Sequence, residues 1–222
     1  MPAVPDGHRR HDLLDVEPAA WAAALAGRPD LAGAPHLAGW AERGFPVIVR
    51  RRHPGEASAR VPVGLPLPPA DGKRRIGLGL APEAVRPRAP VTVARALDAA
   101  PEAWHPTLRA VIGLGERHGL MPRVFGGLLW QSLTGLPYLS ATSDLDLLWP
   151  VSGPIARGFL DAIAAIEARA PMRLDGEILL ADGSGLNWRE LRAPGEAGTV
   201  LAKHRDGLAL RAVGPVLLGA DA

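Results

Sequence analysis

The sequence contains no cysteine and only two lysines, Lys73 and Lys203. The lack of cysteine excludes a disulfide framework, a thiolate zinc site and a cysteine nucleophile, and it makes the cytoplasm the simplest expected location. Because lysine is so scarce, arginine supplies nearly all of the positive charge. The pI is about 9.6 although the formal net charge is only +2. This balance suits a phosphate-bearing ligand.

Long apolar runs are also missing. No stretch approaches the ~20 apolar residues that span a bilayer, so we expect no membrane partner. The first fifteen residues are polar and lack an apolar segment, which argues against a signal peptide. Aromatic residues make up only 5% of the chain and the arginines are scattered, so we do not expect a polymeric nucleic acid as partner. With 47% hydrophobic residues, the chain is expected to fold around a core.

The N-terminal part of the chain predicts a small α+β domain, residues 1–82. Its hydrophobic patterns and turn residues predict helices over 17–26 and 31–43, and strands over 47–49, 61–67 and 74–80. The segment 81–90 contains Pro82, Pro87 and Pro90. We therefore predict an interdomain linker there.

Residues 90–222 predict a second domain that also mixes helices and strands. We expect helices over 92–99, 106–118, 128–133 and 154–170, with a short helical or irregular piece over 187–191. Strands are expected over 123–125, 144–149 and 172–180. A hairpin over 199–213 is expected to turn at Asp206-Gly207. The fold class of the whole chain is therefore α+β.

The strongest chemical signal is the pair Asp144 and Asp146. In a strand, residues i and i+2 point to the same face, so two carboxylates would share one exposed edge. Two adjacent anions favour a divalent cation, and Mg²⁺ prefers few carboxylates together with water and substrate phosphates. The alternative is that both residues are solvated and merely cap a turn. A haloacid-dehalogenase-type phosphatase fits poorly, because Ser143 precedes the first aspartate and Leu148 follows the second.

Gly126 and Gly127 lie upstream, where bare backbone lets a phosphate approach the amide groups and the positive end of a helix. The alternative is a tight strand-to-helix turn. The order of strand, Gly-Gly, helix and Asp-x-Asp strand resembles the nucleotidyltransferase superfamily of polymerase-beta-like enzymes. That resemblance implies a mixed sheet with flanking helices, and a third carboxylate on a neighbouring strand. Asp175 and Glu177 are the candidates, and Asp175 is narrowly preferred.

A more specific resemblance covers nearly the whole chain. Residues 126–139, GGLLWQSLTGLPYL, followed by 143–148, SDLDLL, are similar to the malonate decarboxylase holo-acyl-carrier-protein synthase family, also called phosphoribosyl-dephospho-CoA transferase. Shorter similar pieces are RHDLL at 10–14, PVIVRR at 46–51, LDGE at 174–177, NWRE at 187–190 and VLAK at 200–203. The sequence departs from the superfamily at Gly127, where many members have serine, and in the longer gap from Gly127 to Asp144.

The family resemblance implies the reaction. The donor would be 2′-(5″-triphosphoribosyl)-3′-dephospho-CoA, the acceptor a serine of the malonate decarboxylase acyl-carrier subunit, and the by-product pyrophosphate. Asp144 and Asp146 would bind Mg²⁺ or Mn²⁺, with a second ion shared with Asp175 or Glu177. Donor phosphates would be bound by the following residues: Gly126, Gly127, Ser143, Lys203, Arg123 and Gln131.

A different protein or small-molecule nucleotidyltransferase would keep the same carboxylates, and a non-catalytic carrier-binding module is the alternative from another class. The consecutive Arg50, Arg51 and Arg52 are a candidate surface for an acidic carrier. The six tryptophans are expected in the core, although one exposed ring could stack on the adenine of the donor.

Overall fold

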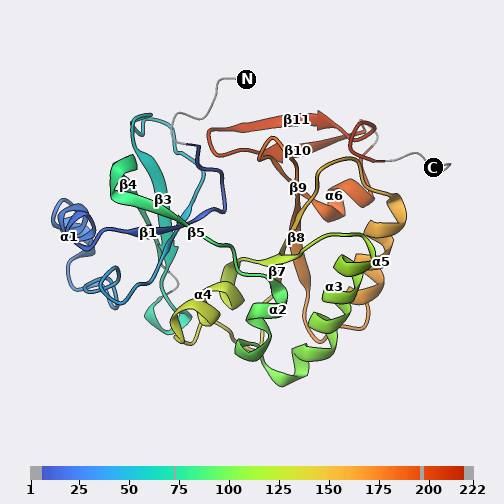
Figure 1. Ribbon diagram of the computed structural model, residues 1–222, viewed down its shortest axis with the longest axis horizontal. Helices are drawn as coiled ribbons and strands as arrows, with labels where there is room; N and C mark the ends of the chain where they lie inside the picture. The colour runs from blue at the N-terminus through green and yellow to red at the C-terminus, as the bar shows by residue number, and fades with distance from the viewer. Residues whose placement is uncertain (1–6, 73, 196–197, 218–222) are drawn as a thin grey trace. The chain divides into compact units, whose positions relative to one another are not determined.

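The structure of the protein is a computed structural model (Figure 1). It describes residues 7–72, 74–195 and 198–217. The chain forms two compact units. The first comprises the chain up to Pro90 together with Leu136–Tyr138, and the second comprises Val91–Gly135 and the chain from Leu139 onward. Both units combine helices with a sheet, which confirms the predicted α+β class. None of the helices that the structure describes has both the length and the hydropathy needed to span a bilayer.

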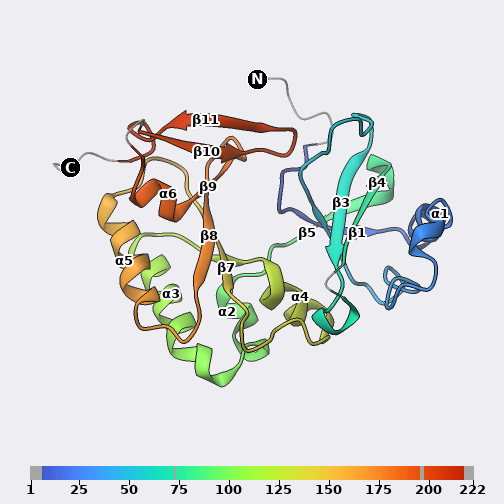
Figure 2. The same ribbon diagram turned by 180° about the vertical axis from the view of Figure 1, so that it is seen from behind.

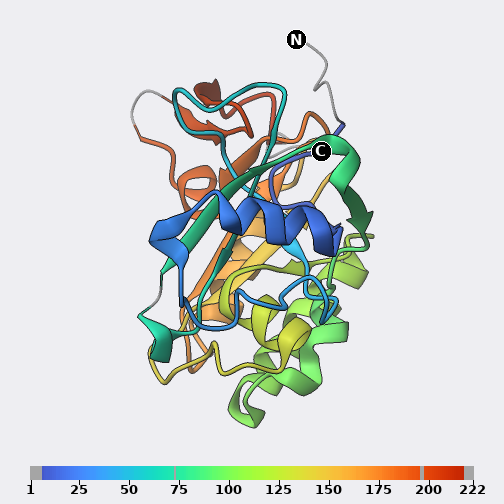
Figure 3. The same ribbon diagram turned by 90° about the vertical axis from the view of Figure 1, so that its left-hand side faces the viewer.

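The first unit is built on a five-stranded antiparallel sheet in the order β4-β3-β2-β1-β5. Its strands are β1 (Leu13–Val16), β2 (Val47–Val49), β3 (Val61–Pro66), β4 (Arg75–Leu80) and β5 (Val85–Arg88). Helix α1 (Pro18–Ala26) buries Trp21, and Figure 3 shows the helix in front of the strands. Short 3-10 turns occupy Pro29–Leu31, Pro69–Asp71 and Pro82–Ala84. The predicted helix over 17–26 and the three predicted strands are confirmed.

Two predictions in this unit were wrong. The helix predicted over 31–43 is replaced by turns, because Gly33, His36 and Gly39 all adopt positive φ angles that a right-handed helix does not allow. The segment 81–90 is not a bare linker, because β5 pairs antiparallel with β1, placing Pro87 opposite Leu14. Proline is tolerated there because β5 is an edge strand.

Tyr138 belongs to the first unit although it follows the second unit's helix in sequence. Its ring is buried, and its hydroxyl donates a hydrogen bond to the Pro66 carbonyl at 2.9 Å. Burial raises the pKa of the Tyr138 hydroxyl, because the phenolate would lose its hydration. The residue therefore acts as a neutral anchor for the segment that contains it.

The second unit is built on a six-stranded mixed sheet in the order β11-β10-β9-β8-β7-β6. Only β7 and β8 pair in parallel; every other neighbouring pair is antiparallel. The strands are β6 (Arg123–Val124), β7 (Leu145–Pro150), β8 (Leu174–Leu179), β9 (Gly185–Asn187), β10 (Thr199–Lys203) and β11 (Leu208–Ala212). The helices are α2 (Val93–Ala96), α3 (His105–Arg117), α4 (Gly126–Thr134), α5 (Arg157–Glu167) and α6 (Trp188–Arg192). Two 3-10 turns lie between α2 and α3, at Leu97–Ala99 and Glu102–Trp104.

Helices α3 and α5 lie side by side against one face of this sheet (Figures 1 and 2). That face carries the alternate residues Leu147 and Trp149 of β7, and the Trp149 ring meets Phe159 of α5 edge-on at 5.0 Å. All three side chains are almost completely buried. Because one face of β7 is committed to the core, the intervening residues must point to the opposite face.

All six tryptophans are buried, as expected. The most accessible of them, Trp104, retains only 7% of its surface. None therefore presents an exposed ring on which an adenine could stack.

Candidate active site

The face of the second sheet opposite α5 gathers the predicted acidic residues. Asp146 of β7 lies directly opposite Asp175 of β8 in the parallel register. Two residue pairs further along, Leu148 lies opposite Glu177, so Asp175 and Glu177 share this face. Asp144 immediately precedes β7, which begins at Leu145. The β7–β8 register therefore brings Asp146 and Asp175 together as neighbours on one surface, here called the acid face.

Gly126 meets this face at the start of α4. It has φ +62°, and a Cβ atom added there would lie 2.6 Å from Cγ of Asp146, with the carboxylate oxygen Oδ2 closer still. Asp146 thus occupies the space that a side chain at position 126 would fill. The sequence predicted that this helix begins at Leu128, but it begins at Gly126. Gly127 therefore belongs to its first turn. A glycine is required at position 126 by its backbone angle and by the neighbouring carboxylate.

Glu177 is held differently from Asp175. Only 4% of its surface is exposed, and Lys203 of β10 forms an ion pair with its Oε1 at 3.2 Å. A buried carboxylate with a cationic partner is already charge-compensated. Asp175 is more exposed and is adjacent to Asp146, so the geometry favours Asp175 over Glu177 as the third carboxylate. Lys203 lies on the acid face, as its bond to Glu177 requires.

Arg123 of β6 lies opposite Leu148, and Leu148 lies opposite Glu177. Residues that pair across a sheet share a face, so Arg123 belongs to the acid face as well. Within residues 7–72, 74–195 and 198–217, its guanidinium forms no hydrogen bond or ion pair. The arginine is therefore a positive group available to an anionic ligand at the edge of the sheet.

Gln131 and Ser143 are both engaged in local structure. The Gln131 amide donates to the Ala99 carbonyl at 2.7 Å and accepts from the Leu139 amide at 3.1 Å, which ties α4 to its flanking segments. The Ser143 hydroxyl accepts a hydrogen bond from the Ser140 amide at 2.9 Å in the turn before Asp144. Their predicted contacts with donor phosphates stay predictions, and Ser143 is the better placed because it adjoins Asp144.

Two residues beside the acid face were not singled out from the sequence. Asn187, at the end of β9, donates to Oδ1 of Asp175 at 3.4 Å. Arg189 of α6 pairs with Glu167, and its guanidinium stacks on the Trp188 ring at 4.3 Å. The hydrogen bond to Glu167 raises the pKa of Arg189, and the negative charges of Asp175 and Asp144 raise it further. Asparagine immediately before a short helix was the available signal, because asparagine is a preferred N-cap.

The acid face offers the donor atoms that Mg²⁺ prefers, which are carboxylate oxygens on adjacent strands. Within the described part of the chain, no three His, Cys, Asp or Glu side chains form a preassembled metal-binding group. Mg²⁺ usually takes only one or two protein carboxylates and completes its shell with water and substrate phosphates. The residues present therefore fit an ion that is completed by a phosphate-bearing substrate.

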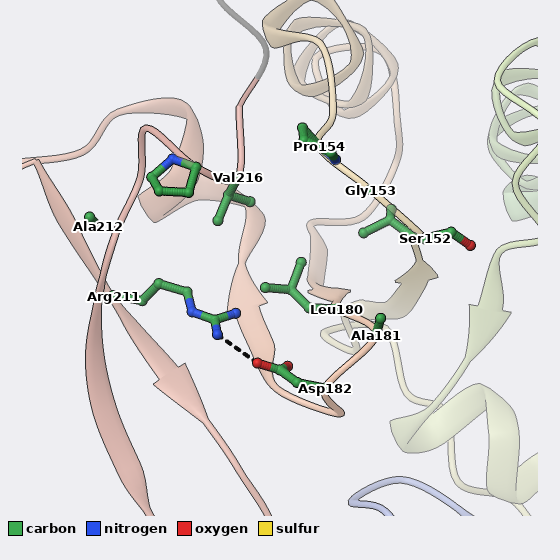
Figure 4. Close-up of a pocket in the computed structure, with 11 residues that line it drawn as sticks. Ser152, Gly153, Pro154, Leu180, Ala181, Asp182, Arg211, Ala212 and Val216 are labelled. Carbon is green, nitrogen blue, oxygen red and sulfur yellow. Dashed lines mark hydrogen bonds and ion pairs between the residues drawn. The ribbon is translucent and has the colours of Figure 1, made fainter. Parts of the chain in front are cut away.

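The second unit also contains a hollow of about 420 Å³ at the other end of the same strands (Figure 4). It begins where β7 and β8 end, between Val151–Pro154 and Leu180–Asp182, and Val216 closes one side. Figure 4 shows Arg211 reaching across to Asp182. The guanidinium and the carboxylate form an ion pair at 2.6 Å. The hollow contains none of the acid-face carboxylates. We therefore place the candidate active site on the acid face, where the reactive groups gather.

Comparisons with known proteins identify the family. Residues 9–90 match the family described as "Phosphoribosyl-dephospho-CoA transferase MdcG N-terminal domain", and residues 92–213 match the corresponding C-terminal domain. A phosphoribosyl-dephospho-CoA transferase from Bradyrhizobium diazoefficiens is 46% identical over 196 residues, covering 87% of this chain and 85% of the relative. The enzyme of the same name from Xanthomonas euvesicatoria is 39% identical over 197 residues, covering 87% of this chain and 89% of the relative.

A more distant relative with this name, from Pseudomonas putida, is 32% identical over 205 residues, covering 82% of this chain and 87% of the relative. No solved structure gives a significant match. The family matches cover both units, and the curated relatives align along most of their length. The chain therefore belongs to the phosphoribosyl-dephospho-CoA transferase family and is a transferase.

Proposed function

We propose that the chain transfers the 2′-(5″-phosphoribosyl)-3′-dephospho-CoA group from its triphosphate donor to a serine of the malonate decarboxylase acyl-carrier subunit, in the cytoplasm, and releases pyrophosphate. Family membership supports the transfer of this prosthetic group. The observation that carries the chemistry is the parallel register of β7 and β8, which sets Asp146 beside Asp175. The bare backbone of Gly126 leaves room for the Asp146 carboxylate.

In this reaction the serine oxygen attacks the phosphorus nearest the ribose, and the bond from that phosphorus to pyrophosphate breaks. Asp144 and Asp146 would hold Mg²⁺ (or Mn²⁺), which would supply positive charge to the triphosphate. Asp175, which would share a second ion with them, orients the attacking hydroxyl and receives its proton. The amides at the start of α4, with Arg123 and Lys203, bind the phosphates and the departing pyrophosphate.

The direct test is to incubate the protein with apo-carrier, the triphosphoribosyl donor and Mg²⁺, and to measure the mass of the carrier. We expect a gain equal to the prosthetic group, which disappears when a chelator is added. A carrier of unchanged mass would refute the proposed acceptor. Release of pyrophosphate from ATP or another nucleoside triphosphate in place of the donor would point to a different nucleotidyltransferase.

The role of the carboxylates is tested with Asp146→Asn against Asp161→Asn. Asp161 lies on α5 and pairs with Arg192 at 2.8 Å, and its side chain is 61% exposed. Both substitutions remove one negative charge and keep the shape of the side chain. We expect Asp146→Asn to abolish transfer with an unchanged melting temperature, and Asp161→Asn to retain full activity. Equal activity of the two variants would contradict the assignment.

A further inference from the structure

The side chain of Asn187 makes two hydrogen bonds that together fix its orientation. Its Oδ1 accepts from the backbone amide of Arg189 at 2.9 Å, which makes Asn187 the N-cap of α6. Its Nδ2 donates to Oδ1 of Asp175 at 3.4 Å. Because only the oxygen of the amide can accept the backbone N–H, the NH₂ group must face Asp175. The cap therefore determines which group is presented to the carboxylate.

Asp175 is held through one of its two oxygens. Oδ1 accepts from Asn187 and also from the amide of Gly176 at 2.8 Å. In the part of the chain that the structure describes, no hydrogen bond reaches Oδ2. Two donors on one oxygen fix the rotation of the carboxylate and leave the second oxygen available beside Asp146.

The backbone just before Asp175 is fixed from two other elements. The Leu174 carbonyl accepts from Nε1 of Trp188 at 3.3 Å and from Arg189 at 2.7 Å. The Leu174 amide donates to Oε1 of Glu167 at 2.9 Å, and Glu167 itself pairs with Arg189. Helices α5 and α6 thus fix the backbone at the start of β8. The remaining freedom of Asp175 is mainly rotation about its side-chain torsion angles. Asn187 removes that remaining freedom.

We infer that Asn187 is a positioning residue for the transfer reaction: it holds Asp175 in one rotamer with Oδ2 directed toward the reacting groups. The inference rests on the proposed function, in which Asp175 orients the serine hydroxyl. Asn187 touches neither donor nor acceptor in this scheme and acts only through Asp175. Loss of its NH₂ group lets the carboxylate rotate, and a misplacement of about 1 Å at a reacting group costs on the order of a hundredfold in rate.

The test uses Asn187→Ser, because serine caps a helix about as well as asparagine but cannot reach or donate to Asp175 in the same way. The control is Thr92→Ala, which removes the N-cap of α2, where Thr92 accepts from the Arg95 amide at 3.3 Å. We expect Asn187→Ser to lower kcat by about ten- to a hundredfold, with unchanged KM for the donor and an unchanged melting temperature. Thr92→Ala should lower the melting temperature and leave kcat unchanged.

A second measurement does not depend on activity. NMR side-chain couplings report the χ1 rotamer of Asp175, and we expect one rotamer in the wild type and averaging in Asn187→Ser. If the wild type does not modify the carrier, the proposed function fails, but the couplings still decide whether Asn187 positions Asp175. A single, unchanged rotamer in Asn187→Ser would overturn the inference. Wild-type kcat in that variant would overturn it equally.

Discussion

Gly126→Ala is the substitution whose consequences the structure defines most closely. An alanine Cβ at this position would lie 2.6 Å from Cγ of Asp146. Ordinary carbon–carbon contacts are about 3.5 Å, so the carboxyl group must move by roughly 1 Å, and a shift of that size costs on the order of a hundredfold in rate. The positive φ of +62° adds a backbone cost of about 1–2 kcal/mol for any residue with a Cβ.

Gly135→Ala is the matched control for this backbone cost. Gly135 ends the same helix, has φ +70°, and an added Cβ there meets nothing within 4 Å. Both variants should therefore lose about 1–2 kcal/mol of unfolding free energy from backbone strain. Only Gly126→Ala also displaces Asp146.

The assay combines urea unfolding with the rate of carrier modification. We expect both variants to unfold at lower urea than the wild type. Transfer should fall about a hundredfold in Gly126→Ala and stay within twofold of wild type in Gly135→Ala. Equal transfer rates in the two variants would show that the position of the Asp146 carboxylate does not limit the reaction, and would refute the reasoning.

Two further predictions concern stability. Burial alone would raise the pKa of Asp182, but hydrogen bonds from Ser184 and Arg211 outweigh it and lower the pKa to about 2. The ionised carboxylate thus stabilises the fold above its ordinary pKa, and this stabilisation is lost as the pH falls toward 2. Asp182→Asn should therefore lower the unfolding free energy by at most about 2 kcal/mol before screening, and urea titrations should show this loss shrinking between pH 5 and pH 2. A pH-independent difference would contradict the prediction. Arg50 donates to three backbone carbonyls and a carboxylate, whereas Arg51 is exposed. Thermal unfolding should therefore show that Arg50→Ala lowers the unfolding free energy by about 2 kcal/mol and that Arg51→Ala leaves it almost unchanged. Equal losses of unfolding free energy in the two variants would contradict this prediction.

The three consecutive arginines have different structural roles. Arg50 pairs with Glu56, and Arg52 donates to the Ala57 and Arg60 carbonyls at 2.6 and 2.9 Å. Both side chains therefore stabilise the loop after β2. Recognition of an acidic carrier by this segment stays a prediction. It is best tested through Arg51, since replacing all three would also disturb the loop.

Most elements of the fold could be predicted because their local patterns agree with their burial. The apolar stripe of α5 is an example, since it commits one side of the helix to the core. The helix predicted over 31–43 does not form, because Gly33, Pro35 and Gly39 interrupt the apolar segment. In that segment Trp40 is buried, and its Nε1 donates to the Pro46 carbonyl at 2.9 Å. Tertiary packing, rather than helical periodicity, explains its apolar residues.

The candidate site could be predicted only up to the pairing of strands. A strand pattern places Asp175 and Glu177 on one face but contains no information about which residue of β7 each will lie beside. The register between β7 and β8 depends on the length and path of the connection through α5. A shift of two residues would have placed Glu177 opposite Asp146. The observed register separates their roles: Glu177 lies deeper and is neutralised by Lys203.

The same register explains why the acidic residues need so many supporting contacts. Asp146 and Asp175 are like charges on neighbouring strands, so each destabilises the other when no cation lies between them. The fold offsets this repulsion with groups that it places around them: the amide of Gly176 and the NH₂ of Asn187 donate to Asp175, and the charge of Arg189 lies nearby. Because these supports come from β8, β9 and α6, the scaffold itself holds the Asp175 carboxylate in place beside Asp146.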